Sequence, residues 1–199
     1  MQPLKHSFAL LPVAALALAA CPGPAAAPSP RAAVPDADEL AVYAVVIDSV
    51  LADPSQPFVV LADSTSVSHV EAETVRNFVT ELDPRFPASA IADYRERNGR
   101  SWPLPPAIAS GAVLRIFTPG SLFVPNGDLR AEYADFQRRY APATNFHTLS
   151  RPGFDAERRH AVIVTGSLCG ALCGHGQLLL LERGPSGWRI TQRRGTWVS

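Results

Sequence analysis

The most reactive side chains of this sequence lie close together near its C-terminus. The stretch GSLCGALCGHG (166–176) places Cys169 and Cys173 four residues apart, and His175 follows two residues later. Thiols and an imidazole at this spacing could bind a metal ion, exchange disulfides, attack a substrate or form a structural disulfide. Each of these chemistries makes a different demand on the rest of the chain.

Metal binding needs more ligands than the stretch contains. Structural zinc takes four, commonly as two closely spaced pairs, and Cys169, Cys173 and His175 supply three. His160 or His147 would have to be the fourth, and the spacing selects neither. A metal site formed by Cys169, Cys173, His175 and His160 therefore stays an alternative.

Thiol exchange and nucleophilic catalysis also lack their usual surroundings. Thioredoxin-like sites have two residues between the cysteines, at the start of a helix, whereas three residues separate Cys169 from Cys173 between segments that resemble strands. No general-base or oxyanion motif surrounds either cysteine. We expect His175 to be a polar loop residue between two glycines.

The N-terminus reads as an export signal. Residues 1–20 have a short polar start and then an apolar run from Phe8 to Ala20, which is too short for a mature membrane span of roughly 20 residues. The run ends in Leu-Ala-Ala-Cys (18–21), which resembles a bacterial lipobox. The resemblance implies that Cys21 is lipidated and becomes the first mature residue. The alternative is ordinary cleavage after Ala27, which would release a soluble protein.

Export bears directly on the cysteine pair. If Cys21 carries lipid, Cys169 and Cys173 are the two that remain, and disulfides persist in the oxidising compartment outside the inner membrane. Bridged Cα atoms lie roughly 4.4–6.8 Å apart, whereas four residues of straight strand span about 13 Å. The segment must therefore turn, which Gly170 and Gly174 permit. We expect a Cys169–Cys173 disulfide that closes a glycine-rich loop.

Composition excludes several functions. The chain has 199 residues, and its 18 basic residues are Lys5, within the signal, and 17 arginines, against 18 acidic residues. The mature chain therefore has a net charge of −1. A surface with this balance of basic and acidic residues gives no reason to expect a nucleic-acid partner. Without a mature lysine there is no Schiff-base chemistry and no phosphate-loop lysine. We expect no cofactor.

Three segments follow from these features. Residues 1–20 are the signal peptide, 21–34 are the lipidated cysteine with a Pro/Ala-rich tether, and 35–199 form a single domain. Apolar periodicity predicts helices at 35–53, 69–82, 89–97 and 129–140, with Asp36 and Glu39 at capping-box spacing in the first. The predicted strands are 58–61, 112–118, 146–150, 159–165, 177–183 and 188–193, with a last short stretch at 197–198. Helices mainly in the N-terminal half and an antiparallel meander in the C-terminal half predict an α+β fold.

The C-terminal 50 residues resemble a group of uncharacterised bacterial exported proteins. The resemblance rests on TLSRPGFD (148–155), HAVIVTG (160–166), CGALCGHGQLLLLER (169–183), GWRI (187–190) and WVS (197–199). It implies that the Cys-Gly-x-Leu-Cys-Gly loop and the last Trp-bearing hairpin form one unit, and it brings no activity. Earlier in the same region, the charged residues Asp155, Glu157, Arg158 and Arg159 predict a solvated turn.

The sequence favours a binding or structural domain over an enzyme. The lipobox predicts a location in the bacterial cell envelope, anchored through lipid with the domain in the periplasm. Pro22, where Asp commonly marks inner-membrane retention, favours the outer membrane. The expected partners are the membrane, through the anchor, and an envelope protein, glycan or small ligand. The alternative function is a metal-handling or thiol-redox module centred on Cys169, Cys173 and His175.

Overall fold

A computed structural model describes residues 35–66, 72–105, 108–121, 123, 126–170 and 172–199. The predicted signal peptide (1–20), Cys21 and the tether (21–34) lie outside the described residues, as do positions 69–71 of the second predicted helix. The described part of the chain contains no helix with the length and hydropathy that a bilayer span requires.

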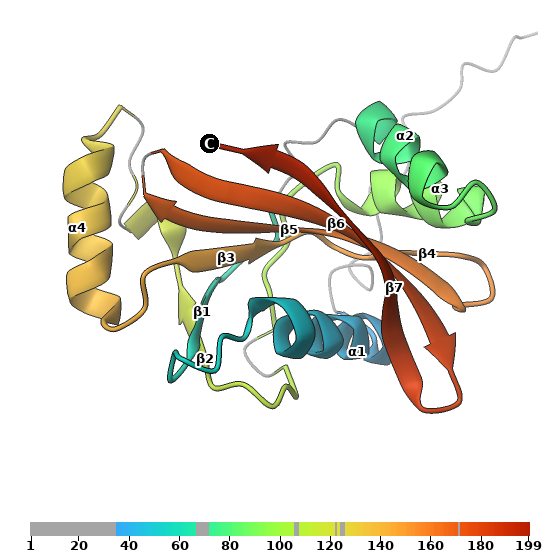
Figure 1. The fold of residues 1–199 in the computed structure, drawn as a ribbon, viewed down its shortest axis with the longest axis horizontal. Coiled ribbons are helices and arrows are strands. Elements are labelled where there is room, and N and C mark those ends of the chain that lie inside the picture. Colours follow the sequence, from blue (N-terminus) through green and yellow to red (C-terminus); the bar gives the residue numbers. More distant parts are fainter. Residues whose placement is uncertain (1–34, 67–71, 106–107, 122, 124–125, 171) are drawn as a thin grey trace, which may run out of the picture.

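One mixed β-sheet organises the domain (Figure 1). Its strand order is β2-β1-β3-β5-β6-β7, and β4 pairs with β5 beyond the end of β3. The strands are β1 (Val59–Ala62), β2 (Leu114–Phe117), β3 (Phe146–Leu149), β4 (Gly153–Phe154), β5 (His160–Gly170), β6 (Cys173–Gly184) and β7 (Gly187–Val198). Strands β3, β5, β6 and β7 are antiparallel neighbours, which confirms the α+β prediction. Strand β1 pairs in parallel with β2 and β3, an arrangement that the sequence did not predict.

Helices cover both faces of the sheet. Helix α1 (Ala37–Val46), continued by the π-helix η2 (Ile47–Leu51), packs on one face (Figure 1). Helices α2 (Ala72–Leu82), α3 (Ala88–Arg97) and α4 (Leu129–Tyr140) pack on the other, and a 3-10 turn, η3 (Pro119–Ser121), follows β2. Strands β5 and β6 are thus enclosed on both sides, which explains why Leu178–Leu181 are four consecutive buried leucines.

Helix α1 is joined to the rest of the domain by a buried ion pair. Asp36 caps the helix by accepting the Glu39 backbone N–H at 2.9 Å, as the capping-box spacing predicts. The Glu39 side chain, which is 1% exposed, has another role. It accepts hydrogen bonds from Arg151 Nε at 2.7 Å and Nη2 at 3.0 Å, and from Arg97 Nη1 at 3.2 Å. The bond from Arg97 joins α1 to α3, and the bonds from Arg151 join α1 to the segment after β3.

The segment after β3 is itself held by Asn98. The Asn98 side chain donates to the backbone oxygen of Arg151 and accepts from its backbone N–H, each at 2.8 Å. The Arg151 guanidinium lies over the Trp102 ring, 4.8 Å from the ring centroid. The hydrogen bonds of Asn98 to the Arg151 backbone and the contact with the Trp102 ring together orient Arg151 toward Glu39. The result is a fixed position of α1, and hence of η2, over the sheet.

Candidate functional site

The glycine-rich stretch is strand rather than loop. Strands β5 and β6 continue through it, with Gly166 opposite Gly176, Ser167 opposite His175 and Leu168 opposite Gly174. The pairing reaches Gly170 opposite Cys173, and a register shift occurs between Leu168 and Gly170. The expectation of a glycine-rich loop over 166–176, with His175 as a loop residue, was therefore wrong.

The glycines are needed for their size, because Trp197 of β7 lies over them. A Cβ built on Gly176 would lie 2.1 Å from Trp197 Nε1, and one on Gly174 would lie 2.9 Å from Trp197 Cζ3. A Cβ on Gly166 would be 3.4 Å from Trp197 Cζ2. Glycines at alternate positions of one strand and across from it on the next form a flat surface for the indole ring. The chain does turn after Gly170, as predicted, but turn propensity was the wrong interpretation of Gly166, Gly174 and Gly176.

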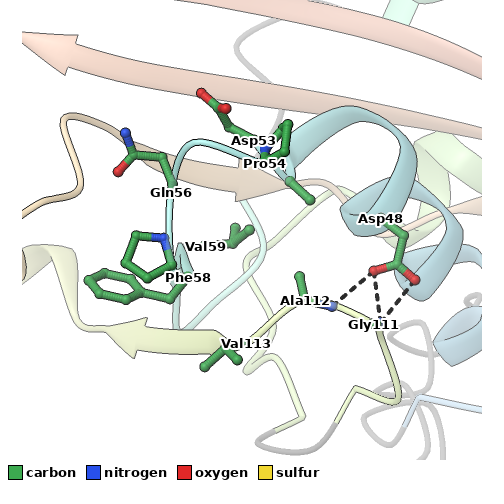
Figure 2. Close-up of a pocket in the computed structure, with 11 residues that line it drawn as sticks. Asp48, Asp53, Pro54, Gln56, Phe58, Val59, Gly111, Ala112 and Val113 are labelled. Carbon is green, nitrogen blue, oxygen red and sulfur yellow. Dashed lines mark hydrogen bonds between the residues drawn. The ribbon is translucent and has the colours of Figure 1, made fainter.

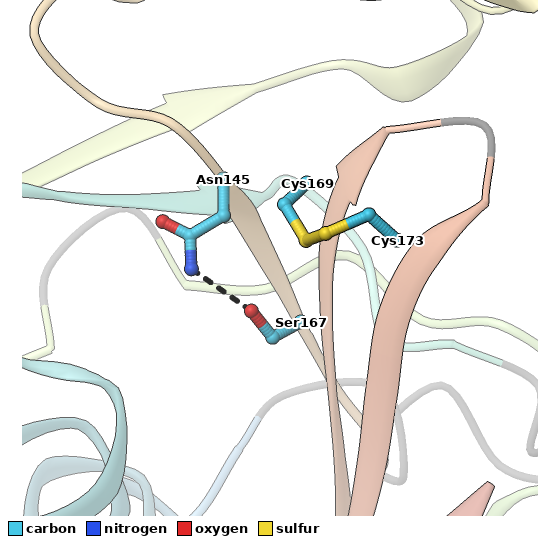
Figure 3. Close-up of a disulfide and its surroundings, with 4 residues drawn as sticks. All are labelled: Asn145, Ser167, Cys169 and Cys173. Atoms are coloured by element: carbon cyan, nitrogen blue, oxygen red, sulfur yellow. Dashed lines mark hydrogen bonds between the residues drawn. A yellow bond between two sulfur atoms is a disulfide. The ribbon is translucent and has the colours of Figure 1, made fainter. Parts of the chain in front are cut away.

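The predicted disulfide is present. Cys169 and Cys173 are bonded, with their Cα atoms 5.1 Å apart, at the tip of the β5–β6 hairpin (Figure 3). A loop this small contributes about 2 kcal/mol by the chain-entropy estimate. Figure 3 also shows the disulfide beside Asn145 and Ser167, where Asn145 Nδ2 donates to Ser167 Oγ at 2.9 Å. The disulfide therefore fixes the end of the hairpin that carries Ser167 and His175.

The structure separates His160 from the other residues of the metal hypothesis. His160 opposes Glu182, whereas Ser167, seven positions along β5, opposes His175, a distance of about 23 Å along the strand. His160 Nδ1 instead lies 2.8 Å from Asp155 Oδ2. Among the described residues, no three His, Cys, Asp or Glu side chains are grouped so that they could hold a metal ion.

Asp155 is the organising residue of the turn between β4 and β5. It is 4% exposed, and its Oδ1 accepts the backbone N–H groups of Arg159 at 2.7 Å and His160 at 2.9 Å. Although burial opposes ionisation, the hydrogen bond from His160 and these backbone bonds lower the pKa of Asp155. The predicted solvated turn was wrong at this residue, while Glu157 and Arg159 are exposed as expected.

Polar side chains gather on the face of the sheet opposite Trp197. His147 on β3, Ser167 on β5 and His175 on β6 oppose one another across the three strands. Two residues along the chain from each of them, and so on the same face, lie three more polar side chains, of which Asn145 directly precedes β3. The six residues of this group, termed the polar array, are Asn145, His147, Thr165, Ser167, His175 and Gln177.

The polar array lines a cavity of about 190 Å³ beneath the end of the first helix. The segment from Val50 to Asp53, which includes the end of η2, lines its other side. On the same sheet face, Leu149, Ile163 and Leu179 pack in the apolar core beneath α1. The face thus changes from apolar to polar at the end of the helix. π-Helical turns are rare and are frequently found at functional sites, which singles out this cavity further.

His147 is the most deeply buried titratable group of the cavity. It is 7% exposed, and its Nδ1 has no hydrogen-bond partner among the described residues. Burial, and to a lesser degree the nearby His175, lower the pKa of His147 to about 4. His147 is therefore a neutral imidazole at physiological pH. A buried polar atom left unpaired costs about 1–3 kcal/mol, which is typical of a site kept for function rather than for stability.

His147 is expected to make the fold sensitive to acid. In the unfolded chain its pKa is about 6.5, so the unfolded state binds one more proton than the folded state between about pH 6.5 and 4. The free energy of unfolding should therefore fall by roughly 2–3 kcal/mol from this residue as the pH falls through that window. Urea unfolding of the wild type and of His147→Gln at pH 7.5 and 4.5 measures it. Equal losses in the two proteins would contradict the assignment.

A second, larger cavity of about 400 Å³ lies at the edge of the sheet (Figure 2). The carboxylate of Asp48 accepts the Gly111 backbone N–H at 2.9 Å and that of Ala112 at 3.3 Å. The other residues that line this cavity include Phe58, Val113 and two prolines, Pro54 and Pro57. Asp48 therefore holds the loop before β2 against η2. Gln56 Oε1 in this lining has no hydrogen-bond partner among the described residues, but polar side chains are fewer here than in the polar array, which is therefore the better candidate site.

The sequence singled out His147 only as a possible metal ligand and His175 as a loop residue or a partner of the cysteines, and it did not identify Asn145, Thr165, Ser167 or Gln177. A signal for them exists. Each strand carries a polar pair at i and i+2, and the next positions in phase are apolar, as in Thr165-x-Ser167 after Ile163. Two-residue periodicity places such a pair on the core face of a strand, where polar groups need an explanation. Which strands lie side by side could not be read from the chain.

Comparison of the chain with known protein families, curated protein sequences and solved structures found no match. The class of protein is therefore defined by the fold and the site alone. It is an α+β domain with a mixed sheet, a disulfide-closed hairpin and a polar cavity on the sheet face.

Proposed function

We propose that the chain is an exported protein of a bacterial envelope, held by lipid on Cys21, with its domain in the periplasm and the outer membrane as the favoured location. The lipobox resemblance at 18–21 and the apolar run before it support the anchor. The Pro/Ala-rich composition of residues 21–34 is typical of a tether between lipid and domain. The Cys169–Cys173 disulfide suits an oxidising compartment. Membership of the exported group with the Cys-Gly-x-Leu-Cys-Gly segment belongs to the same proposal.

The domain binds a small polar ligand in the cavity of the polar array. The observation that carries this is the six polar side chains on three adjacent strands, which face a cavity where the rest of that sheet face is apolar core. Concave sites with a few convergent polar groups are the usual form of small-ligand sites.

The site supports binding rather than nucleophilic catalysis. Ser167 Oγ accepts a hydrogen bond from Asn145, and neither of the opposing histidines is hydrogen-bonded to it among the described residues, so the base that a serine nucleophile requires is not in place. A metal or redox role for Cys169 and Cys173 has less support, because the two sulfurs are bonded to each other.

The anchor is tested by fractionation of the expressed full chain. The wild type should sediment with membranes and incorporate labelled fatty acid, whereas Cys21→Ser should do neither. A Cys169→Ser/Cys173→Ser variant is the matched control and should remain with membranes. A soluble wild type, or a membrane-bound Cys21→Ser variant, would contradict the proposed anchor.

The binding site is tested by a fragment screen of the full chain, read by backbone amide NMR. Bound fragments should shift the amides of His147, Ser167 and His175 together, and Ser167→Val should weaken these fragments. Fragments that gather instead beside Asp48, or none that bind, would contradict the proposed site.

A further inference from the structure

In the described part of the chain, no arginine or lysine lines the cavity of the polar array. His147 is neutral because burial lowers its pKa to about 4. An anion such as phosphate would therefore lose its hydration without gaining a counter-charge. Anions are the wrong class of ligand for this site, although the protein as a whole is rich in arginine.

Negative charge is confined to the rim. Among the described residues that line the cavity, Asp53 is the one carboxylate, and it is exposed. Its Oδ1 accepts the Ser55 backbone N–H at 2.8 Å, and hydrogen bonds from Ser55 keep the pKa of Asp53 below its usual range. A solvated carboxylate attracts a cation only weakly. The buried side chains of the polar array, which are His147, Thr165 and Ser167, are thus neutral groups.

The neutral groups match a ligand that both donates and accepts hydrogen bonds. Thr165 and Ser167 present hydroxyls, Asn145 and Gln177 present amides, and the two histidines present imidazoles. Each of these groups can donate and accept at once. An ammonium group only donates and a carboxylate only accepts, so either would leave part of the polar array unpaired. A ligand hydroxyl does both.

The opposite wall of the cavity is apolar. Val50, Leu51 and Ala52 face the polar array across the cavity. A ligand with hydroxyls on one side and C–H groups on the other fits between these two walls. Strands β3, β5 and β6 each have a neighbour on both sides in the sheet, so their backbone groups are engaged and a peptide could not add as a further strand. Recognition must come from side chains.

The size of the cavity limits the ligand to one small unit. Its volume of about 190 Å³ is below the roughly 300–1,000 Å³ of sites that enclose drug-sized ligands. From these observations we propose that the polar array binds a single neutral sugar unit, with its hydroxyls toward β3, β5 and β6 and its C–H face toward Val50 and Leu51. This inference rests on the proposed function, since it names the ligand class of the same site.

The test uses the full chain purified in a detergent without sugar groups. Glucose, galactose, N-acetylglucosamine, inorganic phosphate, spermidine and zinc are titrated separately, and the imidazole resonances of His147 and His175 are followed by NMR. At least one neutral sugar should shift both resonances in a saturable manner. Thr165→Val removes one hydroxyl at nearly constant shape and should weaken that sugar about five- to tenfold. Thr191→Val, the same change on β7 outside the cavity, should leave the affinity unchanged.

The outcomes separate this inference from the proposed function. Saturable binding of phosphate, spermidine or zinc, with no response to the sugars, would overturn the neutral-sugar inference and leave a ligand site at the polar array. Sugar binding that Thr165→Val does not weaken would overturn the inference as well, because the sugar would then lie elsewhere. No response to any probe, together with a fragment screen that finds nothing at these residues, would overturn both.

Discussion

Replacing Glu39 by glutamine is expected to lower the free energy of unfolding by about 3–5 kcal/mol. Both carboxylate oxygens accept hydrogen bonds from Arg151, and the Tyr43 hydroxyl donates to Oε1 at 3.2 Å. Glutamine would turn an N–H₂ group toward these donors and leave the Arg151 guanidinium, which is 6% exposed, without its counter-charge. Urea unfolding monitored by circular dichroism measures the change.

Two further variants make this prediction specific. Glu182→Gln removes one partner of the exposed Arg189–Glu182 pair and should cost less than about 1 kcal/mol. A Glu39→Leu/Arg151→Met double variant removes both buried charges and should recover much of the loss, because no uncompensated charge remains. A cost for Glu39→Gln no larger than that for Glu182→Gln would show that the buried pair does not hold α1 in place.

Replacing Gly153 by alanine should destabilise the domain by about 3 kcal/mol, at the upper end of ordinary overpacking. Strand β4 packs directly against α3, and a Cβ on Gly153 would lie 2.3 Å from the Tyr94 backbone nitrogen and 2.5 Å from the Ala90 carbonyl oxygen. These are helix backbone atoms, so no side chain can rotate away. Relief requires β4 to separate from α3, which would also strain the hydrogen bond from the Phe154 backbone N–H to Asp93 Oδ2.

Gly195→Ala is the matched control for this substitution. Gly195 also lies in a strand, and no atom outside its own neighbourhood falls within 4 Å of a Cβ built there. Its free energy of unfolding should change by less than about 0.5 kcal/mol. If both alanine variants unfold at the same urea concentration as the wild type, the contact between β4 and α3 is looser than the structure indicates.

Local patterns in the chain determined most of the secondary structure. The helices near 37, 88 and 129 begin and end close to the predicted residues, because apolar periodicity and caps such as Asp36 and Asp128 act within a few residues of each other. The cysteine count and the predicted compartment together led to the Cys169–Cys173 disulfide, which is present. The signal, Cys21 and the envelope location stay predictions.

Only the tertiary structure decided where strands lie side by side. Glycines 166, 174 and 176 indicated a loop, and their role became clear only once β7 placed the indole ring of Trp197 over them. Asp155 and Glu39 looked like surface or capping residues, although their partners, His160 and Arg151, bury them. The polar array likewise combines residues from β3, β5 and β6 with a wall from η2. Helix periodicity is a property of residues that are close in sequence. Strand pairing and the partners of buried polar side chains depend on residues that are distant in sequence. The fold class could therefore be predicted from the chain, whereas the candidate site could not.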